Sequence, residues 1–322
     1  MQALYLDGRL SLRDLPRPTP AADEALVRVT LAGICNTDVE LARGYMAYRG
    51  VPGHEFVGVV EAAPDAAWIG ARVVGEINAF CGECDTCRAG RPTHCPNRTT
   101  LGIAGRDGAF AEYLTLPVRN LHRVPDGVSD EQAVFTEPLA AALEILEQIH
   151  VRPTDRVVVL GDGKLGLLVA QVLATVADVT AIGRHRNKLD ILARRGIRVS
   201  VGGAEVASGA DVVVEATGNV DGFRQARRLV RTRGTLVLKS TFAGDLAGLL
   251  DGEGMNFLSA LVVDEIALVG SRCGPFAPAL RLLAEGRVDV ESLIHARYPL
   301  SDALAAFEHA QRSGVLKVLV SP

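Results

Sequence analysis

The sequence predicts an α/β protein, with one parallel-sheet domain and a second, β-rich domain. Two observations support this class. Short alternating apolar runs separated by Gly and Pro recur up to about Phe135, among them Ala25–Leu31 and Phe56–Glu61, and such runs are typical of short strands. Beyond about Pro138, continuous apolar strands alternate with helical stretches, which is the pattern of βαβ units in a parallel sheet.

The second part of the chain has the more regular pattern. We expect helices at Ala140–Ile149 and Lys164–Ala177, and strands at Arg156–Leu160, Val179–Ile182, Asp211–Glu215 and Thr235–Leu238. The last segment, about Pro275–Pro322, is expected to hold helices near Pro278–Glu285 and Ser301–Arg312 and a final strand, Lys317–Val320. A chain of 322 residues has room for two domains of about 100–200 residues each.

Composition excludes several classes of partner. The formal net charge of −4 gives no electrostatic reason to expect nucleic acid or anionic lipid as a partner. The N-terminal segment carries Asp7 and has no apolar stretch long enough for a signal peptide. The longest apolar region, about Leu165–Ala177, is too short to cross a bilayer. These features predict a soluble, cytoplasmic protein.

A glycine motif follows the first buried strand of the second part. The hexapeptide Gly161-Asp162-Gly163-Lys164-Leu165-Gly166 comes directly after Arg156–Leu160 and opens a helix, and that context makes G-x-G-x-x-G a strong signal for dinucleotide binding. Gly161 permits the turn, Gly163 lets backbone N–H groups approach the pyrophosphate, and Gly166 allows close packing. Lys164 either touches phosphate or simply begins a solvated helix. An ordinary glycine-rich loop is the alternative.

The residues after the next strand favour NADP over NAD. An NAD site needs Asp or Glu about 20 residues beyond the first glycine, to bind the ribose 2′-hydroxyl. The strand Val179–Ile182 is followed instead by Gly183, Arg184, His185 and Arg186, which offer space and positive charge to a 2′-phosphate. Arginine is also a common solvated loop residue. A Gly183→Asp variant is therefore expected to shift the preference toward NAD.

Four cysteines form the sharpest motif in the chain. Cys81, Cys84, Cys87 and Cys95 lie within 15 residues, and thiolates two residues apart can turn back onto one tetrahedral zinc ion. Four thiolates leave no open coordination position, so this zinc is expected to be structural. A redox Cys-x-x-Cys pair is the main alternative, although it leaves two of the cysteines unexplained.

Other candidate ligands are not informative one by one. Cys35 alone reads as a small core residue, His54 as a structurally satisfied histidine, and Glu137, before a proline, as a helix entry. Glu55 directly follows His54. These residues gain meaning only from the motifs around them.

Taken in order, those motifs resemble the zinc-containing medium-chain dehydrogenase/reductase family, near its sorbitol and threonine dehydrogenase branch. The resemblance covers nearly the whole chain and rests on GICNTD, GHEFVGVV, the four-cysteine lobe, DGAFAEY, TEPLA, GDGKLG and DVVVEATG. It implies a GroES-like catalytic domain at 1–138, to which 275–322 returns, and a Rossmann dinucleotide-binding domain at 139–274. It also implies one catalytic and one structural Zn2+ per chain.

The resemblance assigns roles to particular residues. Cys35 and His54 correspond to ligands of the catalytic zinc, Glu137 to a third position that binds directly or through water, and Glu55 to a ligand or a close neighbour of the ligands. Thr37 corresponds to the hydroxyl that relays the alcohol proton. The positions that correspond to strand ends near the nicotinamide are Thr217, Gly218, Gly270 and Ser271.

The chain departs from the family pattern in a few places. Asn36 replaces the usual glycine between Cys and Thr, and Pro64 and Ala71 stand where Gly and Asp are usual. The chain is also shorter than most members, with the loss placed between the strands near Val199 and Val212. The first change bears on the pocket, and the next two bear on turns.

The expected activity is zinc-dependent hydride transfer between a secondary alcohol (a polyol, sugar or amino alcohol) and NAD(P). The alternatives are a biosynthetic NADPH-dependent aldehyde or ketone reductase, a lyase or isomerase that uses the nucleotide transiently, and a nucleotide-sensing protein that is not an enzyme. The resemblance implies a homodimer or homotetramer, commonly formed through the edge of the nucleotide-domain sheet. The apolar segment Glu265–Val269 either serves that contact or is a buried strand.

Overall fold

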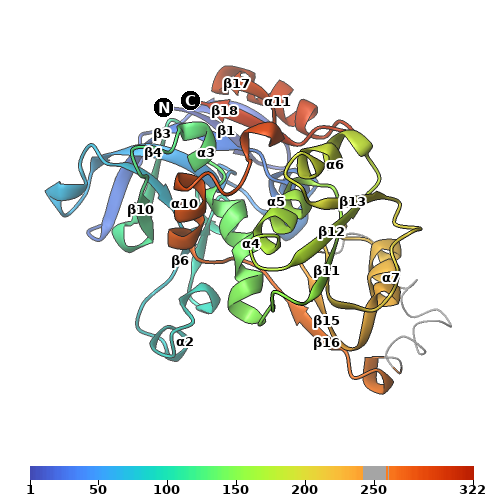
Figure 1. Cartoon of the computed structure of the whole chain (residues 1–322). Helices are drawn as coiled ribbons and strands as arrows, with labels where there is room; N and C mark the ends of the chain where they lie inside the picture. The colour runs from blue at the N-terminus through green and yellow to red at the C-terminus, as the bar shows by residue number, and fades with distance from the viewer. Residues whose placement is uncertain (242–258, 260) are drawn as a thin grey trace. The chain divides into compact units, whose positions relative to one another are not determined.

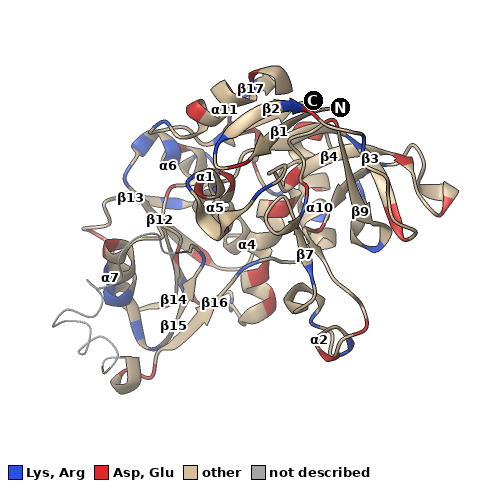
Figure 2. Ribbon diagram, turned by 180° about the vertical axis from the view of Figure 1, so that it is seen from behind, with Lys and Arg blue, Asp and Glu red and all other residues tan. Residues whose placement is uncertain are grey.

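The computed structural model describes residues 1–241, 259 and 261–322, and it divides into two compact units (Figure 1). The first unit comprises Met1–Pro138 and Phe276–Pro322, and the second comprises Leu139–Pro275. Basic and acidic residues, coloured blue and red on the ribbon in Figure 2, are interspersed along the chain of each unit. No helix of the described residues combines the length and the apolar composition that a membrane crossing requires.

The first unit is built on a mixed, mainly antiparallel sheet of seven strands. Its order is β10-β5-β4-β3-β18-β17, with β9 also paired to β3. Central strand β3 (Glu24–Gly33) is buried along most of its length and pairs antiparallel with β4 (Glu55–Ala62) and with β18 (Lys317–Ser321). The C-terminal strand therefore lies beside a strand from the beginning of the chain, and the end of β3 meets the start of β4 where Gly33 faces Glu55.

The remaining elements of this unit either complete the sheet, as β5, β9, β10 and β17 do, or lie outside it. They are β1 (Gln2–Leu6), β2 (Leu10–Asp14), α1 (Asn36–Ala42), β5 (Arg72–Gly75), β6 (Asn78–Ala79), α2 (Asp85–Arg88), β7 (Thr99–Leu101), β8 (Gly105–Arg106), β9 (Tyr113–Pro117), β10 (Leu121–Arg123), α3 (Asp130–Ala133), α10 (Phe276–Ala284), β17 (Ile294–Pro299) and α11 (Ala303–Ala310). Helix α4 (Thr136–Gln148) begins in this unit and continues into the second.

The second unit contains a parallel sheet of six strands in the order β13-β12-β11-β14-β15-β16. The strands are β11 (Arg156–Leu160), β12 (Asp178–Gly183), β13 (Arg198–Val201), β14 (Ala210–Glu215), β15 (Val230–Leu238) and β16 (Ala267–Gly270). Helices α5 (Lys164–Leu173), α6 (Arg186–Ala193) and α7 (Val220–Leu229) connect them. The predicted α/β class with a Rossmann-type parallel sheet is confirmed.

Apolar periodicity explains this unit. Strand β11 is buried on both faces after its first residue, because a parallel sheet covered by helices needs apolar side chains on both sides. Phe223 and Leu229 of α7 pack into a core with Val158, Val213 and other strand residues. Each such fully buried side chain stabilises the fold by about 1.5–3 kcal/mol.

Several elements differ in their bounds from the sequence-based expectation, and two of these differences bear on the interpretation. The helix expected over Lys164–Ala177 ends at Leu173, and the hydroxyl of Thr175 donates to the carbonyl of Val172 at 2.6 Å, which satisfies a carbonyl at the end of the helix. The segment Glu265–Val269 contributes to edge strand β16, whose Leu268 is 46% exposed. The buried-strand interpretation of that segment is therefore wrong.

Candidate metal centres and dinucleotide site

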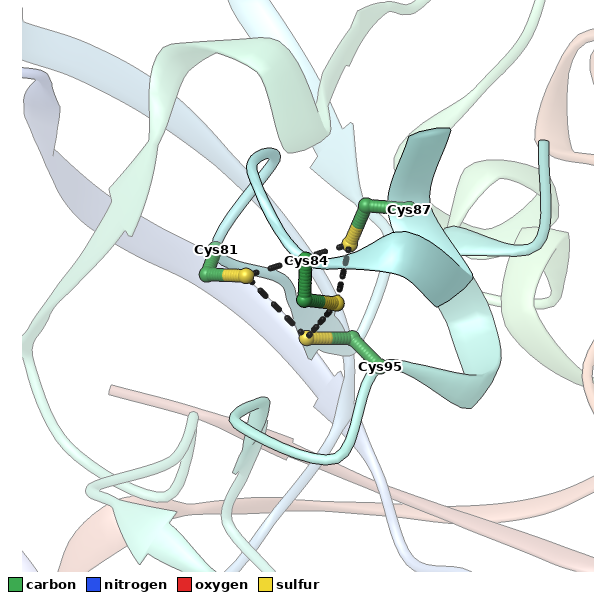
Figure 3. Close-up of side chains that lie close together, drawn as sticks. All are labelled: Cys81, Cys84, Cys87 and Cys95. Atoms are coloured by element: carbon green, nitrogen blue, oxygen red, sulfur yellow. Dashed lines mark hydrogen bonds between the residues drawn. The ribbon is translucent and has the colours of Figure 1, made fainter. Parts of the chain in front are cut away.

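The four sulfur atoms of Cys81, Cys84, Cys87 and Cys95 face one another (Figure 3). Their Sγ atoms lie 3.5 Å apart for Cys84 and Cys87, 3.5 Å for Cys81 and Cys95, 3.7 Å for Cys84 and Cys95, and 4.0 Å for Cys81 and Cys87. Four sulfurs each about 2.3 Å from one tetrahedral zinc ion stand about 3.8 Å apart. All four are free thiols, too far apart for disulfides, whose sulfurs lie about 2.05 Å apart. The donor set fits a zinc ion.

Local backbone geometry builds this cysteine cluster. Cys84 caps the N-terminus of the short helix α2, and Gly82 and Gly90 adopt positive φ angles in the turns on either side. Backbone N–H groups of Glu83 and Cys84 lower the pKa of Cys81 to about 6. Burial and the neighbouring thiols raise the pKa of Cys87 to about 12. Four thiolates therefore need a cation among them, because their negative charges otherwise oppose one another.

A second cluster lies at the junction of β3 and β4. One ligand atom each from Cys35, His54 and Glu55 falls within 4.8 Å of the others. Cys35 follows β3 and precedes α1, whereas His54 and Glu55 stand at the start of β4. The antiparallel register that sets Gly33 against Glu55 brings the two segments together. His54 is 3% exposed and Glu55 is 1% exposed, so the donors face the interior of this unit.

Asp38, which sequence reasoning missed, supports both donors. Its carboxylate is completely buried on α1; Oδ2 accepts from the backbone N–H of Cys35 at 2.8 Å, and Oδ1 lies 3.2 Å from Nδ1 of His54. Burial alone lowers the pKa of His54, but the charge of Asp38 outweighs it and raises that pKa well above its ordinary value. With Nδ1 facing Asp38, Nε2 of His54 is left for a metal. The position of Asp38 three residues after Cys35 is its only signal in the sequence.

Lys317 was also missed, because it begins a strand far away in the sequence. Its ammonium group donates to the carboxylate of Glu55, and the backbone oxygen of Ile34 lies 3.4 Å away. Both side chains are 1% exposed, and the ammonium lies 5.6 Å from the ring centroid of Phe135. The charge of Glu55 is therefore neutralised from the side of β18.

The other residues assigned to chemistry lie at two places. The Thr37 hydroxyl is 3.7 Å from the sulfur of Cys35, so it belongs to the second cluster. Glu137 lies in the first turn of α4. Among the described residues, the group of ligand atoms within 4.8 Å consists of Cys35, His54 and Glu55 and does not include Glu137. Its role as a third ligand stays a prediction.

The glycine motif has the local geometry expected of it. A Cβ at Gly161, where φ is +124°, would lie 2.7 Å from the carbonyl oxygen of Ala216, and one at Gly166 would lie 2.1 Å from the carbonyl oxygen of Gly161. Side chains are thus excluded at both positions. Gly163 precedes α5, whose first residues are Lys164 and Leu165. The N-terminus of a helix presents free N–H groups and a positive dipole to an anion.

The remaining residues assigned to dinucleotide binding follow the carboxyl ends of parallel strands. Leu160 pairs with Glu215, Glu215 with Leu238, and Leu238 with Gly270, so the loops after these strands share one edge of the sheet. That edge is where open α/β sheets bind ligands. The assigned residues on these loops are Gly161, Gly163, Thr217, Gly218 and Ser271. Gly270 and Gly183 are the last residues of β16 and β12, and Arg184 and His185 follow β12 at the same edge.

A buried carboxylate shapes one of these loops. Glu215 is completely buried at the end of β14, and it accepts hydrogen bonds from the backbone N–H and hydroxyl of Thr217 and from the N–H of Gly218. Burial raises the pKa of Glu215, and these hydrogen bonds oppose the rise. In the neighbouring loop, Ser271 accepts a hydrogen bond from Lys239 at 3.0 Å.

Comparison with known proteins agrees with this geometry. Residues 21–126 match the alcohol dehydrogenase GroES-like domain, and residues 131–321 match the glucose dehydrogenase C-terminus. Sorbitol dehydrogenase of Halalkalibacterium halodurans is 32% identical, with 98% of this chain and 96% of that protein covered. D-arabitol-phosphate dehydrogenase of Enterococcus avium is 28% identical, with 97% and 94% covered.

Solved structures extend the similarity to the whole fold. A candidate zinc-binding dehydrogenase of Sinorhizobium meliloti 1021, bound to NADP, is similar with a TM-score of 0.88 at 29% identity, covering 100% of this chain and 99% of that one. An alcohol dehydrogenase (rspB) of Escherichia coli CFT073, complexed with NADH, is similar with a TM-score of 0.89 at 26% identity, covering 100% of this chain and 99% of that one.

The fold and the clustered donors define a two-unit α/β protein of the dehydrogenase class. The chain belongs to the zinc-containing medium-chain dehydrogenase/reductase family, as the motifs in its sequence predicted.

Proposed function

We propose that this dehydrogenase transfers hydride between a secondary alcohol and NAD(P), and that the alcohol is a polyol, a sugar or an amino alcohol. The observation that carries the proposal is the meeting of the half-buried Cys35 with the buried His54 and Glu55 at the junction of β3 and β4. Relatives named for sorbitol, D-arabitol phosphate and L-threonine support this substrate class.

Cys35 and His54 would hold the catalytic zinc ion, since a thiolate and an imidazole are usual zinc donors. Glu137 is the proposed third ligand. When bound, zinc supplies Lewis acidity, which brings the pKa of an alcohol toward neutrality. The Thr37 hydroxyl, next to the sulfur of Cys35, accepts the alcohol proton and passes it outward. Asp38 holds His54 in one orientation and tautomer.

Glu55 has a supporting role in this proposal. Its carboxylate is engaged by Lys317, so it shapes the field around the other two donors rather than serving as a permanent ligand. Cys81, Cys84, Cys87 and Cys95 would hold the second, structural zinc ion, which stabilises a lobe with little core of its own.

The dinucleotide would bind along the carboxyl edge of the second unit's sheet. Gly161, Gly163, Lys164 and Leu165 would receive the pyrophosphate at the N-terminus of α5. The exposed Arg184, which follows Gly183, favours NADP. Use of NADP would suit a biosynthetic aldehyde or ketone reductase, which is the same chemistry in the opposite direction.

We also propose that the chain forms a homodimer through β16. Among the described residues, this strand is at one edge of the sheet, with Leu268 46% exposed, and an unpaired strand edge is a template for a second copy.

Metal analysis together with a substrate panel tests the proposal. Secondary alcohols, polyols and amino alcohols are assayed with NAD and with NADP. We expect two zinc ions per chain and dinucleotide reduction with at least one polyol, sugar or amino alcohol. Cys35→Ala and His54→Ala should abolish turnover, whereas Cys273→Ala, the matched control, should retain it. Full turnover in either ligand variant would refute the assigned site.

Thr37 is tested separately by a pair of variants. Thr37→Val removes the hydroxyl while keeping the shape, and Thr37→Ser keeps the hydroxyl. We expect kcat to fall by about 100-fold in the Val variant, the low end for a positioned proton relay, and to stay near the wild-type value in the Ser variant. Equal kcat values in the two variants would argue against the relay.

A further inference from the structure

Asp162, the first of the three variable residues within the glycine motif, reaches across to the loop that follows β12. Its Oδ2 accepts hydrogen bonds from the backbone N–H of Arg184 at 2.7 Å, from the backbone N–H of His185 at 2.6 Å, and lies 3.0 Å from Nδ1 of His185. The residue is 8% exposed. One carboxylate therefore joins the pyrophosphate loop to the loop that faces the adenosine ribose in a Rossmann-type site.

The carboxylate fills the space of the side chain that Gly183 lacks. A Cβ at Gly183 would lie 2.4 Å from Cβ of Asp162 and 2.6 Å from its Oδ2. Position 183 is the end of the second strand, where an NAD-specific site carries its acidic residue. The acidic group is thus present at that place, but it comes from β11's loop rather than from β12.

This geometry overturns one expectation from the sequence. The Gly183→Asp variant was expected to shift the preference toward NAD, but an aspartate at 183 would collide with Asp162. The collision involves Asp162 atoms close to the backbone, so a small rotation cannot relieve it. A single substitution at 183 is therefore a test of packing and not of cofactor preference.

The carboxylate is charged, and it occupies donors that a phosphate would need. Burial raises the pKa of Asp162, but hydrogen bonds from the backbone and the ring of His185 outweigh it and lower that pKa below the usual value. The N–H groups of Arg184 and His185 stand just before α6, where a 2′-phosphate would seek donors. A 2′-hydroxyl can donate to a carboxylate, whereas a phosphate of about −1.5 to −2 charge is repelled by it.

We propose that Asp162 is a specificity-determining residue that lowers the affinity of this site for dinucleotides with a 2′-phosphate. The inference rests on the proposed function, in that the second unit must bind NAD(P). Arg184 and the basic residues along α6 (Figure 2) attract a 2′-phosphate, and Asp162 opposes them. The relative affinity for NAD and NADP therefore depends on both the basic residues and the Asp162 carboxylate.

Binding of NADH and NADPH, measured by fluorescence titration of the whole chain, tests the proposal. Asp162→Asn removes the charge at nearly constant shape, and Asp162→Ser keeps an acceptor for the N–H groups if the amide variant folds poorly. We expect the ratio of NADPH to NADH affinity to rise at least about tenfold in both variants, the change that one charge-assisted hydrogen bond produces. Asp178→Asn, at the opposite end of β12, is the control for net charge, and its ratio should stay at the wild-type value.

A relocation variant adds a second test. Asp162→Gly with Gly183→Asp moves the carboxylate back to β12 and removes the colliding atoms. We expect this double variant to favour NADH relative to Asp162→Gly alone. If wild type binds both dinucleotides and the ratio is unchanged in the Asn and Ser variants, the role of Asp162 is refuted. If wild type binds neither dinucleotide, the proposed function fails and this inference fails with it.

Discussion

Lys317 and Glu55 form an ion pair in which each side chain is 1% exposed. The two residues are far apart in the sequence and lie on β18 and β4, the strands on opposite sides of β3. Their side chains meet over Gly33 of β3, which has no side chain to separate them. A charge buried this deeply requires a partner, since removal of one member leaves the other desolvated and uncompensated. The ion pair thus links the C-terminal strand to the residue next to the proposed zinc ligand His54.

Replacement of Lys317 by methionine should destabilise the chain strongly. Loss of one partner of a buried ion pair costs about 3–5 kcal/mol, and we expect this loss in the free energy of unfolding measured with urea. The double variant Lys317→Met/Glu55→Gln removes both charges and should recover much of the loss. A double variant no more stable than Lys317→Met would contradict the idea that the unpaired Glu55 carboxylate causes the loss.

Asp38→Asn should weaken metal binding more than it weakens folding. The amide keeps the shape of the side chain but removes the charge that faces Nδ1 of His54. Loss of such a supporting partner typically lowers metal affinity on the order of 10- to 100-fold, and competition with a chromophoric chelator measures this change. Glu40→Gln, on the same helix but paired with Arg43 at the surface, is the matched control. Equal affinities in the two variants would remove Asp38 from the site.

Cys84→Ser should release one of two zinc ions and leave the other in place. The four sulfurs form one closed set, so loss of one donor weakens the grip on the ion while the Cys35 and His54 site is unaffected. Elemental analysis should fall from about two zinc ions per chain to about one, as expected for loss of a four-thiolate site, and Tm should fall. Cys273→Ser should keep both ions. Unchanged zinc content in Cys84→Ser would mean that the cluster holds no metal.

The contribution of Glu215 to the free energy of unfolding should decrease as the pH rises. Burial raises the pKa of this carboxyl above its ordinary value of 4.5, so the native state binds more protons than the unfolded state between pH 4.5 and the raised native pKa. The free energy of unfolding falls with pH across that window. Glu215→Gln should lack this component, which appears as a difference in the pH dependence of urea midpoints.

Glu205 is a control, because its effect on the pH dependence of the free energy of unfolding has the opposite sign. A hydrogen bond from Ser200 lowers its pKa, so its contribution is present above pH 4.5 and is lost as the pH falls through the native pKa. Glu205→Gln should therefore change the acid side of the profile only. If Glu215→Gln has the same pH profile as wild type, the buried carboxyl does not titrate abnormally.

Leu268→Lys should weaken the proposed dimer. A lysine in the middle of an edge strand discourages pairing with another chain, and Leu268 faces solvent in the single chain. Light scattering coupled to size exclusion should show a shift from dimer to monomer. Val201→Lys is the matched control at the opposite edge, since β13 is the other outer strand and Val201 is 47% exposed. A dimer that persists in Leu268→Lys would place the contact elsewhere.

The sequence predicted those parts of the fold that local patterns determine. Arg156–Leu160 matches β11 at both ends because its apolar run is bounded by Asp155 and by the glycine motif. The end of α5 was missed, because the apolar pattern continues to Ala177 while the chain turns after Leu173. The four cysteines were found because all their ligands lie within one short segment.

Residues that depend on long-range pairing were not predictable in this way. Lys317 reaches Glu55 because β18 and β4 both pair with β3. No local sequence pattern predicts these pairings. The glycine motif gives Asp162 no role of its own, since its contact with Gly183 arises from the parallel pairing of β11 and β12. Asp38 approaches His54 only because the pairing of β3 and β4 brings the start of β4 to α1.

The unit that carries the metal donors is assembled from two separate stretches of chain, Met1–Pro138 and Phe276–Pro322. An excised fragment of residues 1–138 would lack β18, so it would expose the side of β3 and leave Glu55 without its counter-ion. Both chain ends belong to this unit, and Figures 1 and 2 mark them near each other. A circular permutant that joins the two ends and opens the chain near Phe276 would make this unit one continuous stretch of chain. In that form the unit could be fused to a different dinucleotide-binding domain.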